Sequence, residues 1–561
     1  MSAVSAANCP GAKKVCYRDT PVKRKHDLTF KIFYYFSPFG GAAMLALVLA
    51  AVALALCAAL LFAYLAFSMT YWRRRGVPNA PAALPWGNFA DSILGRKTQF
   101  QVINDIYWRY RGERYIGTYF TATPLLHIHD PEIIRQVFIK EFQDFHGRGM
   151  HSDPERDPLS GNLFILAGQP WRNMRVKLRP TFTSGKIKYM FHTISECAAH
   201  LREHVLASIK AGGGGEYVED VRELAARFST DVITSVAFGV ESNSMKNPDS
   251  EFRRIGQRIF EPCLENSFRA LLSFFGGNIM RIFGIHNSPR DVSAFFIKVV
   301  GEIVAHRELH GVERADMMQL LIQLKNQGFV APDGEQADKS NGHSEESITK
   351  VTEKEMAAHV FVFFLAGFET TSTTISFALF ELAKNPEAQE KLLEEIDAVL
   401  KKSKGEVTYD TIMNMPYMEM VVQETMRMYP PVPFLTRQAM VRRQLPLTDL
   451  TLDKGTRLLI PVSALHYDPR YWDKPDRYDP SRFTEEAKQT RPAMVYLPFG
   501  DGPRICIGMR MGLVQVKTAL VSILSRARVS MVPGTPTEAE MNPRTVIPTP
   551  MDGIRLRLSA R

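Results

Sequence analysis

A single cysteine near the C-terminus stands in a loop that could hold a metal through sulfur. The loop reads FGDGPRICIG over residues 499–508, with three glycines and a proline around Cys506, and a helical pattern follows it. Backbone N–H groups of such a loop and the N-terminus of the next helix stabilise a thiolate, which is one of the axial ligands of haem iron in proteins. The alternative is a structural thiol in a glycine-rich turn.

An acid and an alcohol interrupt the longest apolar helical pattern of the chain. The pattern begins with capping-box spacing at Thr352 and Glu355 and runs without proline to Lys384. Its middle contains AGFETT, which places Glu369 and Thr370 in the least polar stretch of the chain. Burial of polar groups in such a stretch costs free energy unless they form hydrogen bonds, so they are expected to have a hydrogen-bond partner or a functional role. The structural alternative is a threonine that bonds back to the carbonyl one turn earlier.

A second helical pattern, MPYMEMVVQETMRMYPP, carries an acid and a base three residues apart. Glu424 and Arg427 therefore lie on one helix face. A weak surface ion pair is the general alternative, but the flanking residues are mostly apolar, which favours a buried pair.

These segments resemble the motifs of the cytochrome P-450 family. FGDGPRICIG is similar to the haem-binding signature, in which the cysteine is the fifth iron ligand. AGFETT resembles the oxygen-activation motif, which implies that Glu369 feeds a proton relay and Thr370 holds oxygen and water in place. Glu424 and Arg427 match the Glu-x-x-Arg motif, and Arg482 in DPSRF is its expected third partner, although Ser481 stands where the family more often has glutamate.

The resemblance also implies a pocket for haem b, iron protoporphyrin IX. Arginine binds carboxylates through a planar fork of N–H groups, which suits the haem propionates. Trp171 and Arg175 in PWRNMR match the family's Trp-x-x-x-Arg helix. The full set of cofactor-binding residues implied in this way is Cys506, Trp171, Arg175, Arg437, Arg504, Arg148 and Phe499.

The expected architecture is mainly α with a smaller β region (α+β), a cytochrome P-450 fold preceded by one transmembrane helix. The resemblance covers residues 78–561. Helical patterns dominate from residue 88 onward, and the strand-like pieces are YIGTYF, TPLLHIHD and TRLLIPVSALHY. The polar stretch at residues 331–347 is expected to be a surface loop.

The N-terminal region predicts a membrane anchor. Residues 40–69 contain no charge, and about twenty apolar residues suffice to span a bilayer. Tyr71 and Trp72 then read as an aromatic interfacial pair. The expected organisation is a basic extension at residues 1–38, an anchor at 39–72, a basic and proline-rich hinge at 73–87, and a haem-binding catalytic domain at 88–561.

The charge distribution and the cysteine content argue against a nucleic-acid-binding protein, a disulfide-rich protein and a protein with covalently attached haem. The net charge is +10, but residues 1–75 carry ten Lys or Arg against Asp19 and Asp27, a net of +8 next to the apolar stretch. An anionic membrane surface is thus favoured as partner over a nucleic acid. Six cysteines without a Cys-x-x-Cys spacing disfavour a disulfide framework and a covalently attached haem.

Two long segments resemble insect microsomal detoxification enzymes of the family. They are DPLSGNLFILAGQPWRNMRVKLRPTFTSGKIKYMF and MPYMEMVVQETMRMYPPVPFLTRQAM. The likeness implies a monooxygenase that inserts one atom of dioxygen into lipophilic small molecules, at the cytosolic side of the endoplasmic reticulum membrane. Substrates would be xenobiotics such as plant toxins or insecticides, or endogenous lipids.

Electrons must come from another protein, because no nucleotide-binding glycine fingerprint is visible. NADPH cytochrome reductase is the expected donor, with cytochrome b5 as a further one. Basic residues that follow Trp171 suit an acidic partner surface, although a solvated basic face is the alternative; they are Arg172, Lys177, Arg179, Lys186 and Lys188.

Two other functions remain open at this stage. Relatives of the fold rearrange or dehydrate oxygenated lipids without dioxygen, which the Glu369 and Thr370 pair disfavours. A membrane-tethered haem or lipid binder would not need Thr370 or Cys506 for its role.

Overall fold

The structure is a computed structural model that describes residues 38–213, 215–328 and 350–561. The chain divides into two compact units, Met1–Ala63 and Tyr64–Arg561. The expected extension at residues 1–38, apart from its last residue, and the polar stretch at 331–347 lie outside the described residues.

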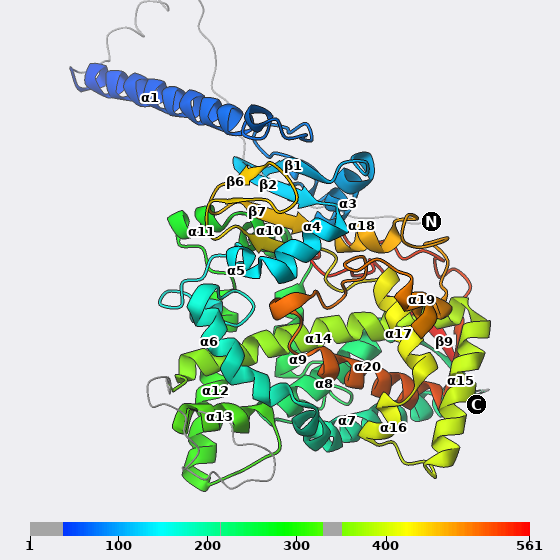
Figure 1. Ribbon diagram of the computed structural model, residues 1–561. Helices are drawn as coiled ribbons and strands as arrows, with labels where there is room; N and C mark the ends of the chain where they lie inside the picture. Colours follow the sequence, from blue (N-terminus) through cyan, green and yellow to red (C-terminus); the bar gives the residue numbers. More distant parts are fainter. Residues whose placement is uncertain (1–37, 214, 329–349) are drawn as a thin grey trace, which may run out of the picture. The chain divides into compact units, whose positions relative to one another are not determined.

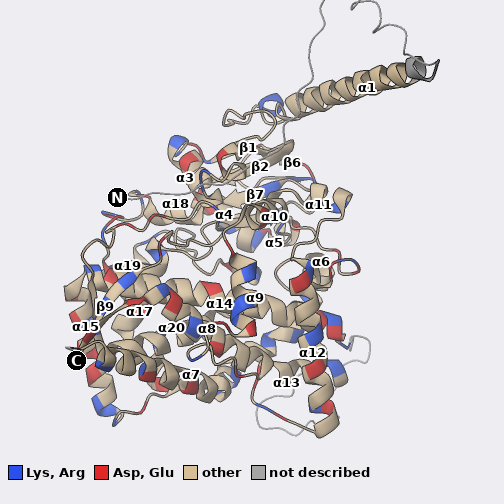
Figure 2. Cartoon of the chain, turned by 180° about the vertical axis from the view of Figure 1, so that it is seen from behind, with Lys and Arg blue, Asp and Glu red and all other residues tan. Residues whose placement is uncertain are grey.

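Helix α1 (Pro38–Ser68) matches the expected apolar span at 40–69 and contains no charged residue, as Figure 2 shows. The stretch from Ala43 to Arg75 is long and apolar enough to cross a membrane, and its most apolar 18-residue part is not buried at all. Helix α14 (Glu353–Lys384) passes the same test of length and composition, but it is mostly buried and is therefore a core helix.

The larger unit consists mainly of helices (Figure 1). The longer helices are α3 (Gln99–Arg109), α6 (Gly168–Leu178), α7 (Ser184–Ala211), α8 (Val221–Phe238), α9 (Glu251–Phe260), α10 (Leu264–Phe275), α12 (Arg290–His310), α13 (Met317–Asn326), α14, α15 (Pro386–Lys402), α17 (Pro416–Met428) and α20 (Met509–Leu524). The short ones are α2 (Ala90–Ile93), α4 (Pro131–Arg135), α5 (Phe142–Phe145), α11 (Gly277–Phe283), α16 (Tyr409–Met413), α18 (Val462–Tyr467) and α19 (Glu485–Gln489).

The strands form a smaller β region in three sheets. The first sheet has the order β1 (Tyr115–Phe120), β2 (Thr123–Ile128), β7 (Arg457–Ile460), β4 (Leu435–Gln438), with only the β2–β7 pair parallel. The second has the order β3 (Glu216–Asp220), β9 (Arg555–Ala560), β8 (Ala527–Met531), and the third pairs β5 (Arg443–Gln444) with β6 (Thr451–Leu452). The expected α+β class is confirmed.

One expected strand is only partly a strand. YIGTYF forms β1 over its full length, whereas TRLLIPVSALHY divides into β7 and helix α18. Pro461 separates the two because proline cannot donate to a strand ladder and often precedes or begins a helix. The apolar run VSALHY was therefore wrongly assigned to a strand.

Helix α14 lies at the centre of the helical part, packed against α8, α12, α17 and α20. Its N-terminus has the expected capping box, in which Thr352 and Glu355 bond each other's backbone N–H. Gly367 lets α8 approach closely, since an added Cβ would lie 2.7 Å from Ile233. This contact fixes the rotation of α14 and thereby decides which of its residues face the site described next.

Trp72 belongs to the core of the larger unit. Its indole is fully buried, donates to the carbonyl of Thr118 at 3.1 Å, and lies over Gly117 of β1, where a Cβ would clash with the ring. The interpretation of Trp72 as part of an interfacial pair is therefore wrong. Large aromatic residues favour both settings, and the sequence alone did not separate them.

Candidate active site

The loop of Cys506 is held closed by its own backbone. The N–H of Cys506 donates to the carbonyl of Phe499 at 3.0 Å, and the N–H of Ile505 donates to that of Gly502 at 2.9 Å. Gly502 has φ +71°, and a Cβ there would lie 2.1 Å from the carbonyl oxygen of Phe138. Glycine at this position allows the loop to press against the neighbouring helical turn, which fixes the direction of the Cys506 side chain.

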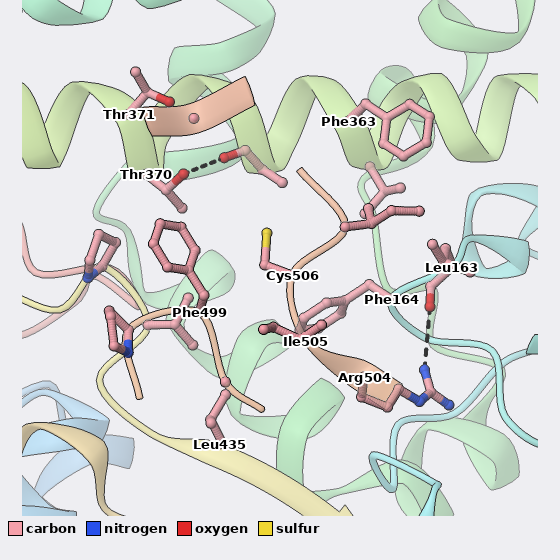
Figure 3. A pocket seen from close by; sticks show the side chains of 18 of the residues that line it. Leu163, Phe164, Phe363, Thr370, Thr371, Leu435, Phe499, Arg504, Ile505 and Cys506 are labelled. Atoms are coloured by element: carbon pink, nitrogen blue, oxygen red, sulfur yellow. Dashed lines mark hydrogen bonds between the residues drawn. The ribbon is translucent and has the colours of Figure 1, made fainter. Parts of the chain in front are cut away.

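Cys506 points into a cavity of about 230 Å³ between its loop and helix α14. Figure 3 shows its sulfur directed at α14, where Thr370 projects from the opposite side. The side chain is accessible only because the cavity is open beside it, and protein surrounds it otherwise. The wall also includes Ala366 of α14 and Leu513 of α20.

Burial raises the pKa of the Cys506 thiol above its usual value. The backbone N–H of Gly508 and the charges of Arg175 and Arg148 act in the opposite direction. The expected N–H group facing the sulfur is thus present, but burial outweighs it. A thiol in this setting becomes a thiolate when a metal takes the place of its proton.

Four arginines line the same cavity: Arg148, Arg175, Arg437 and Arg504. Each of them donates at least one hydrogen bond to a backbone carbonyl. Arg148 donates to Phe164 at 2.7 Å, and Arg175 donates to Ile505 in the cysteine loop at 2.7 Å.

Arg504 and Arg437 also rest on aromatic rings. The guanidinium of Arg504 lies 4.1 Å from the ring centre of Trp171 and donates to the carbonyl of Leu166 at 2.7 Å. The guanidinium of Arg437 lies 3.9 Å from the ring centre of Phe138, and its buried Nε has no hydrogen-bond partner.

No carboxylate of the described residues pairs with any of these four arginines. Burial, reinforced by their mutual repulsion, lowers the pKa of Arg148 to about 10, of Arg437 to about 9 and of Arg504 to about 7. Buried cations without counter-charge are costly, so the cavity favours an anionic occupant. A planar macrocycle with two carboxylates and a thiolate-binding iron fits this donor set.

Glu369 and Thr370 lie on different faces of α14. Thr370 lines the cavity, and its hydroxyl donates to the carbonyl of Ala366 at 2.5 Å. This is the back-bonding geometry that the sequence left as an alternative. Glu369 is buried and pairs with Arg222 of α8 at 2.5 Å instead of facing the cavity. Arg222 also approaches the hydroxyl of Thr549 at 3.4 Å.

The Glu424 and Arg427 pair is buried as expected. Arg427 donates to the Glu424 carboxylate from Nε at 2.7 Å and from Nη2 at 2.9 Å, and both side chains are fully buried. Arg482 lies 3.3 Å from the same carboxylate. Glu424 thus joins the helix to the segment that precedes the cysteine loop.

A second cavity of about 280 Å³ adjoins the first. The two share wall residues, among them Phe164, Val362, Ala366 and Thr370. Much of the second cavity is lined by aliphatic and aromatic side chains, including Ile259, Phe361 and Val546. The space over Thr370 therefore continues into a largely apolar chamber.

The sequence did not point to Arg222 or Thr549. Arg222 follows a helix cap in EDVRELAARF, and only its position beside α14 makes it the partner of Glu369. Of the two small residues in AGFETT, Ala366 lines the cavity, whereas Ile233 fills the space beside Gly367.

Comparison with known proteins gives one consistent family. The family model described as Cytochrome P450 matches residues 78–556. Cytochrome P450 6k1 of Blattella germanica is 40% identical over 499 residues, 88% of this chain and 94% of that protein.

Two further relatives are similar over the same region. Cytochrome P450 6a2 of Drosophila melanogaster is 38% identical, over 88% of this chain and 95% of its own length. Cytochrome P450 6d1 of Musca domestica is 35% identical, over 89% of this chain and 98% of its own length. Together with the thiol, the arginines and the apolar chamber, this similarity shows that the chain belongs to the cytochrome P-450 family and is a haem-dependent monooxygenase.

Proposed function

We propose that this enzyme oxidises lipophilic small molecules in the second cavity while Cys506 holds the haem iron. One observation carries the proposal: the thiol points into a cavity edged by four arginines that no described carboxylate neutralises, and two of them, Arg437 and Arg504, are buried. Bound haem supplies the activation of dioxygen and the transfer of one oxygen atom to the substrate. The residues of the chain bind the cofactor, position the substrate and deliver protons.

The cofactor would be held at its edge and at its centre. Arg148, Arg175, Arg437 and Arg504 would bind the two propionates, and the unpartnered Nε of Arg437 is a donor ready for one of them. Trp171 supports this edge by stacking under Arg504. Phe499 lines the cavity beside Cys506 and limits access to the sulfur.

Protons would reach the cavity through Thr370. Its hydroxyl gives its own hydrogen to Ala366 and can accept a hydrogen bond from water in the cavity. Glu369 would pass protons on, and the ion pair with Arg222 holds its carboxylate turned away from the cavity until the pair opens. Thr549 lies beside this pair and also lines the second cavity, so its hydroxyl connects the pair to that cavity.

The second cavity favours largely apolar substrates. Its walls at α14 and at residues 431–434 are apolar, and shape decides binding in such a chamber more than polar contacts do. This supports broad lipophilic substrates, such as plant toxins, insecticides or endogenous lipids. The resemblance to insect microsomal detoxification enzymes implies the same class of substrate.

Electrons would enter from the side of helix α6. Arg175 of this helix bonds the cysteine loop, while Arg172 and Arg179 are exposed on its outer side. Lys188 of α7 extends this basic surface and pairs with Asp410. An acidic face of NADPH cytochrome reductase, or of cytochrome b5, would dock here, close to the thiol.

Charge reversal tests this docking surface. The variant Arg172→Glu/Arg179→Glu should slow reduction by the reductase at least tenfold and leave the binding of a lipophilic ligand unchanged. Lys298→Glu on α12 is the control, since its side chain is also exposed but lies outside the surface. Equal reduction rates in both variants would remove the surface from consideration.

We further propose that α1 anchors the enzyme in the endoplasmic reticulum membrane with the catalytic unit on the cytosolic side. The uncharged helix supports the anchor. The orientation follows the resemblance to microsomal enzymes, because Lys and Arg flank both ends of the span. Protease protection in intact microsomes tests the orientation, because a cytosolic catalytic unit is digested without detergent.

The ligand assignment is tested by absorption spectroscopy. The membrane-bound protein, reduced and exposed to carbon monoxide, should show a strongly red-shifted Soret band that Cys506→His loses. A band unaffected by the substitution would overturn Cys506 as ligand. A product that forms without NADPH, reductase and dioxygen would favour a rearranging or dehydrating enzyme instead.

A further inference from the structure

Two surface segments separate the second cavity from solvent. One is the loop segment, residues 149–165, which contributes Met150, Phe164 and others to the cavity wall. The other is the helical segment, residues 264–289, which contains α10 and α11 and contributes Ala270, Phe274 and others. Both have exposed stretches on their outer side, at residues 154–156 and 281–284. The opposite wall is the buried helix α14.

The two segments belong to different parts of the hydrophobic core. Leu159 and Leu163 of the loop segment pack into the large helical cluster around α14. Leu271 and Phe275 of the helical segment pack into a separate cluster with the first sheet. The seam between the segments therefore depends strongly on polar bonds, which water can replace when the seam opens.

Arg457 of β7 provides the central bonds of this seam. Its side chain is buried, with 6% of the residue exposed. Nη2 donates to the carbonyl of Gly149 at 2.7 Å, and Nη1 donates to the carbonyl of Phe275. One guanidinium thus joins the first residue of the loop segment to the last residue of α10.

Among the described residues, the surroundings of Arg457 supply backbone carbonyls and no carboxylate as hydrogen-bond partners for its guanidinium. No carboxylate of the described residues pairs with it, and burial lowers its pKa to about 10. The C-terminus of α10 carries the negative end of the helix dipole, which offsets part of the cost of the buried charge. Glycines make room on both sides, since a Cβ at Gly149 would lie 2.7 Å from Nε and one at Gly277 would lie 2.8 Å from Nη2.

Asn287 joins the same two segments a second time. Its side chain donates to the carbonyl of His151 at 2.9 Å, and its backbone N–H donates to the carboxylate of Asp157 at 2.7 Å. Ser273 of α10 donates to the Asn287 amide oxygen at 2.7 Å. Arg457 and Asn287 thus provide two sets of hydrogen bonds between the loop and helical segments, both beside the apolar chamber. Such bonds can hold the two segments together and still break when the segments move apart.

We propose that Arg457 is a positioning residue that controls the passage of substrate and product through the seam between the loop and helical segments. Release of its two carbonyl bonds lets the segments part, and their re-formation closes the chamber over the substrate. The proposal rests on the proposed function for the identity of the chamber's occupant. The hydrogen bonds by which Arg457 joins the two segments do not depend on the proposed function, and the first experiment tests them without substrate.

The first experiment is limited proteolysis of the full-length enzyme in detergent. Arg156 lies on the loop segment with 74% of its side chain exposed, so trypsin can cut after it when the segment opens. Arg457→Met keeps the side-chain length and removes the bonds, and cleavage after Arg156 should become about tenfold faster, a change equivalent to about 1.4 kcal/mol. Arg528→Met in β8 is the matched control and should cleave at the wild-type rate.

The second experiment compares ligands of two sizes by stopped-flow absorption. Imidazole and 1-phenylimidazole both bind haem iron through nitrogen, but only the larger one needs a wide opening. Arg457→Met should speed the dissociation of 1-phenylimidazole about tenfold and that of imidazole by much less. Equal effects on both ligands would point to a change at the iron and overturn the proposal.

A third variant keeps the test valid if Arg457→Met does not fold. Gly277→Ala leaves the charge in place and pushes the guanidinium away from the Gly149 carbonyl, which would lie 3.2 Å from the new Cβ. It should speed both cleavage and 1-phenylimidazole release. Wild-type rates of both would overturn the proposal, as would faster cleavage with unchanged ligand release. An enzyme that shows no haem spectrum with either ligand would instead contradict the proposed function.

Discussion

Two sets of buried arginines in this enzyme differ in what neutralises them. Arg427 shares a fully buried, two-point ion pair with Glu424, and Arg482 completes that group. Arg437 and Arg504, together with Arg148 and Arg175, line a cavity and pair with no described carboxylate. The first set is satisfied by the protein itself, whereas the second is satisfied only when an anion binds. Burial of charge alone therefore does not mark a binding site, but burial without a counter-charge does.

Breaking the first set, the ion pairs of Arg427 and Arg482 with Glu424, should give the largest effect on stability. Arg427→Met leaves the Glu424 carboxylate buried with only Arg482 nearby, and it should lower the free energy of unfolding by about 3–5 kcal/mol. Urea unfolding followed by circular dichroism measures this. The double variant Glu424→Gln/Arg427→Met should be less destabilised than the single one. A single variant as stable as the wild type would show that the pair is not essential to the fold.

The second set, called here the open set, consists of the four cavity arginines, and a substitution in it should not destabilise the haem-free protein. Arg437→Met removes a cation that has no protein counter-charge, so the haem-free protein should be at least as stable as the wild type. The holoenzyme should lose haem to apomyoglobin about 10- to 100-fold faster, because a charge-assisted hydrogen bond contributes about 1.5–3 kcal/mol. If the haem-free variant were strongly destabilised, the distinction between the two sets would fail.

The thiol of Cys506, which lines the same cavity as the open set, makes cofactor binding depend on pH. Burial raises the pKa of Cys506, so the haem-free protein keeps the proton that iron must displace. Haem affinity should therefore rise about tenfold per pH unit below that pKa. The stability of the haem-free protein should fall above pH of about 8.5, where the unfolded thiol ionises and the folded one does not.

Cys506→Ser is the control for both pH measurements and should show neither trend. Haem titration by absorption and urea unfolding at several pH values provide the data. Arg175→Met should extend both trends to higher pH without moving the pH at which stability begins to fall, because the Arg175 charge lowers the pKa of the thiol only in the folded protein. A pH-independent haem affinity in the wild type would contradict the proton release.

The smallest effect is expected at the aromatic support of the open set. Trp171→Leu removes the ring under Arg504, a cation–π contact of about 0.5–1 kcal/mol, so haem loss should become about two- to fivefold faster. Trp171→Phe should lie between this variant and the wild type. An effect as large as that of Arg437→Met would mean that Trp171 binds the cofactor directly.

Local patterns were sufficient to predict several features. The capping box at Thr352 and Glu355, the strand YIGTYF and the buried Glu424 and Arg427 pair all depend on residues close together in the chain, and the structure has each of them. The placement of Cys506, Thr370 and the four arginines around one cavity agrees with the resemblance, although their roles in binding haem stay predictions.

Features that depend on distant packing were not predictable. The partner of Glu369 is Arg222, which is 147 positions away, and nothing in the spacing of either residue indicates the pair. The helix α18 was missed because apolar periodicity over six residues does not separate a strand from a helix. The spacing of AGFETT likewise does not show which of its small residues borders the cavity, since that depends on Ile233 of α8, which fills the space beside Gly367.

The burial of Trp72 has a practical consequence for making a water-soluble form of the enzyme. A deletion of the anchor that also removes Trp72 would leave a hole over Gly117 and free the carbonyl of Thr118 and the hydroxyl of Tyr119, which the tryptophan now bonds. Loss of a buried tryptophan costs about 3–5 kcal/mol. A shortened protein that begins before Tyr71 should therefore fold, whereas one that begins at Arg73 should be recovered mostly as aggregate.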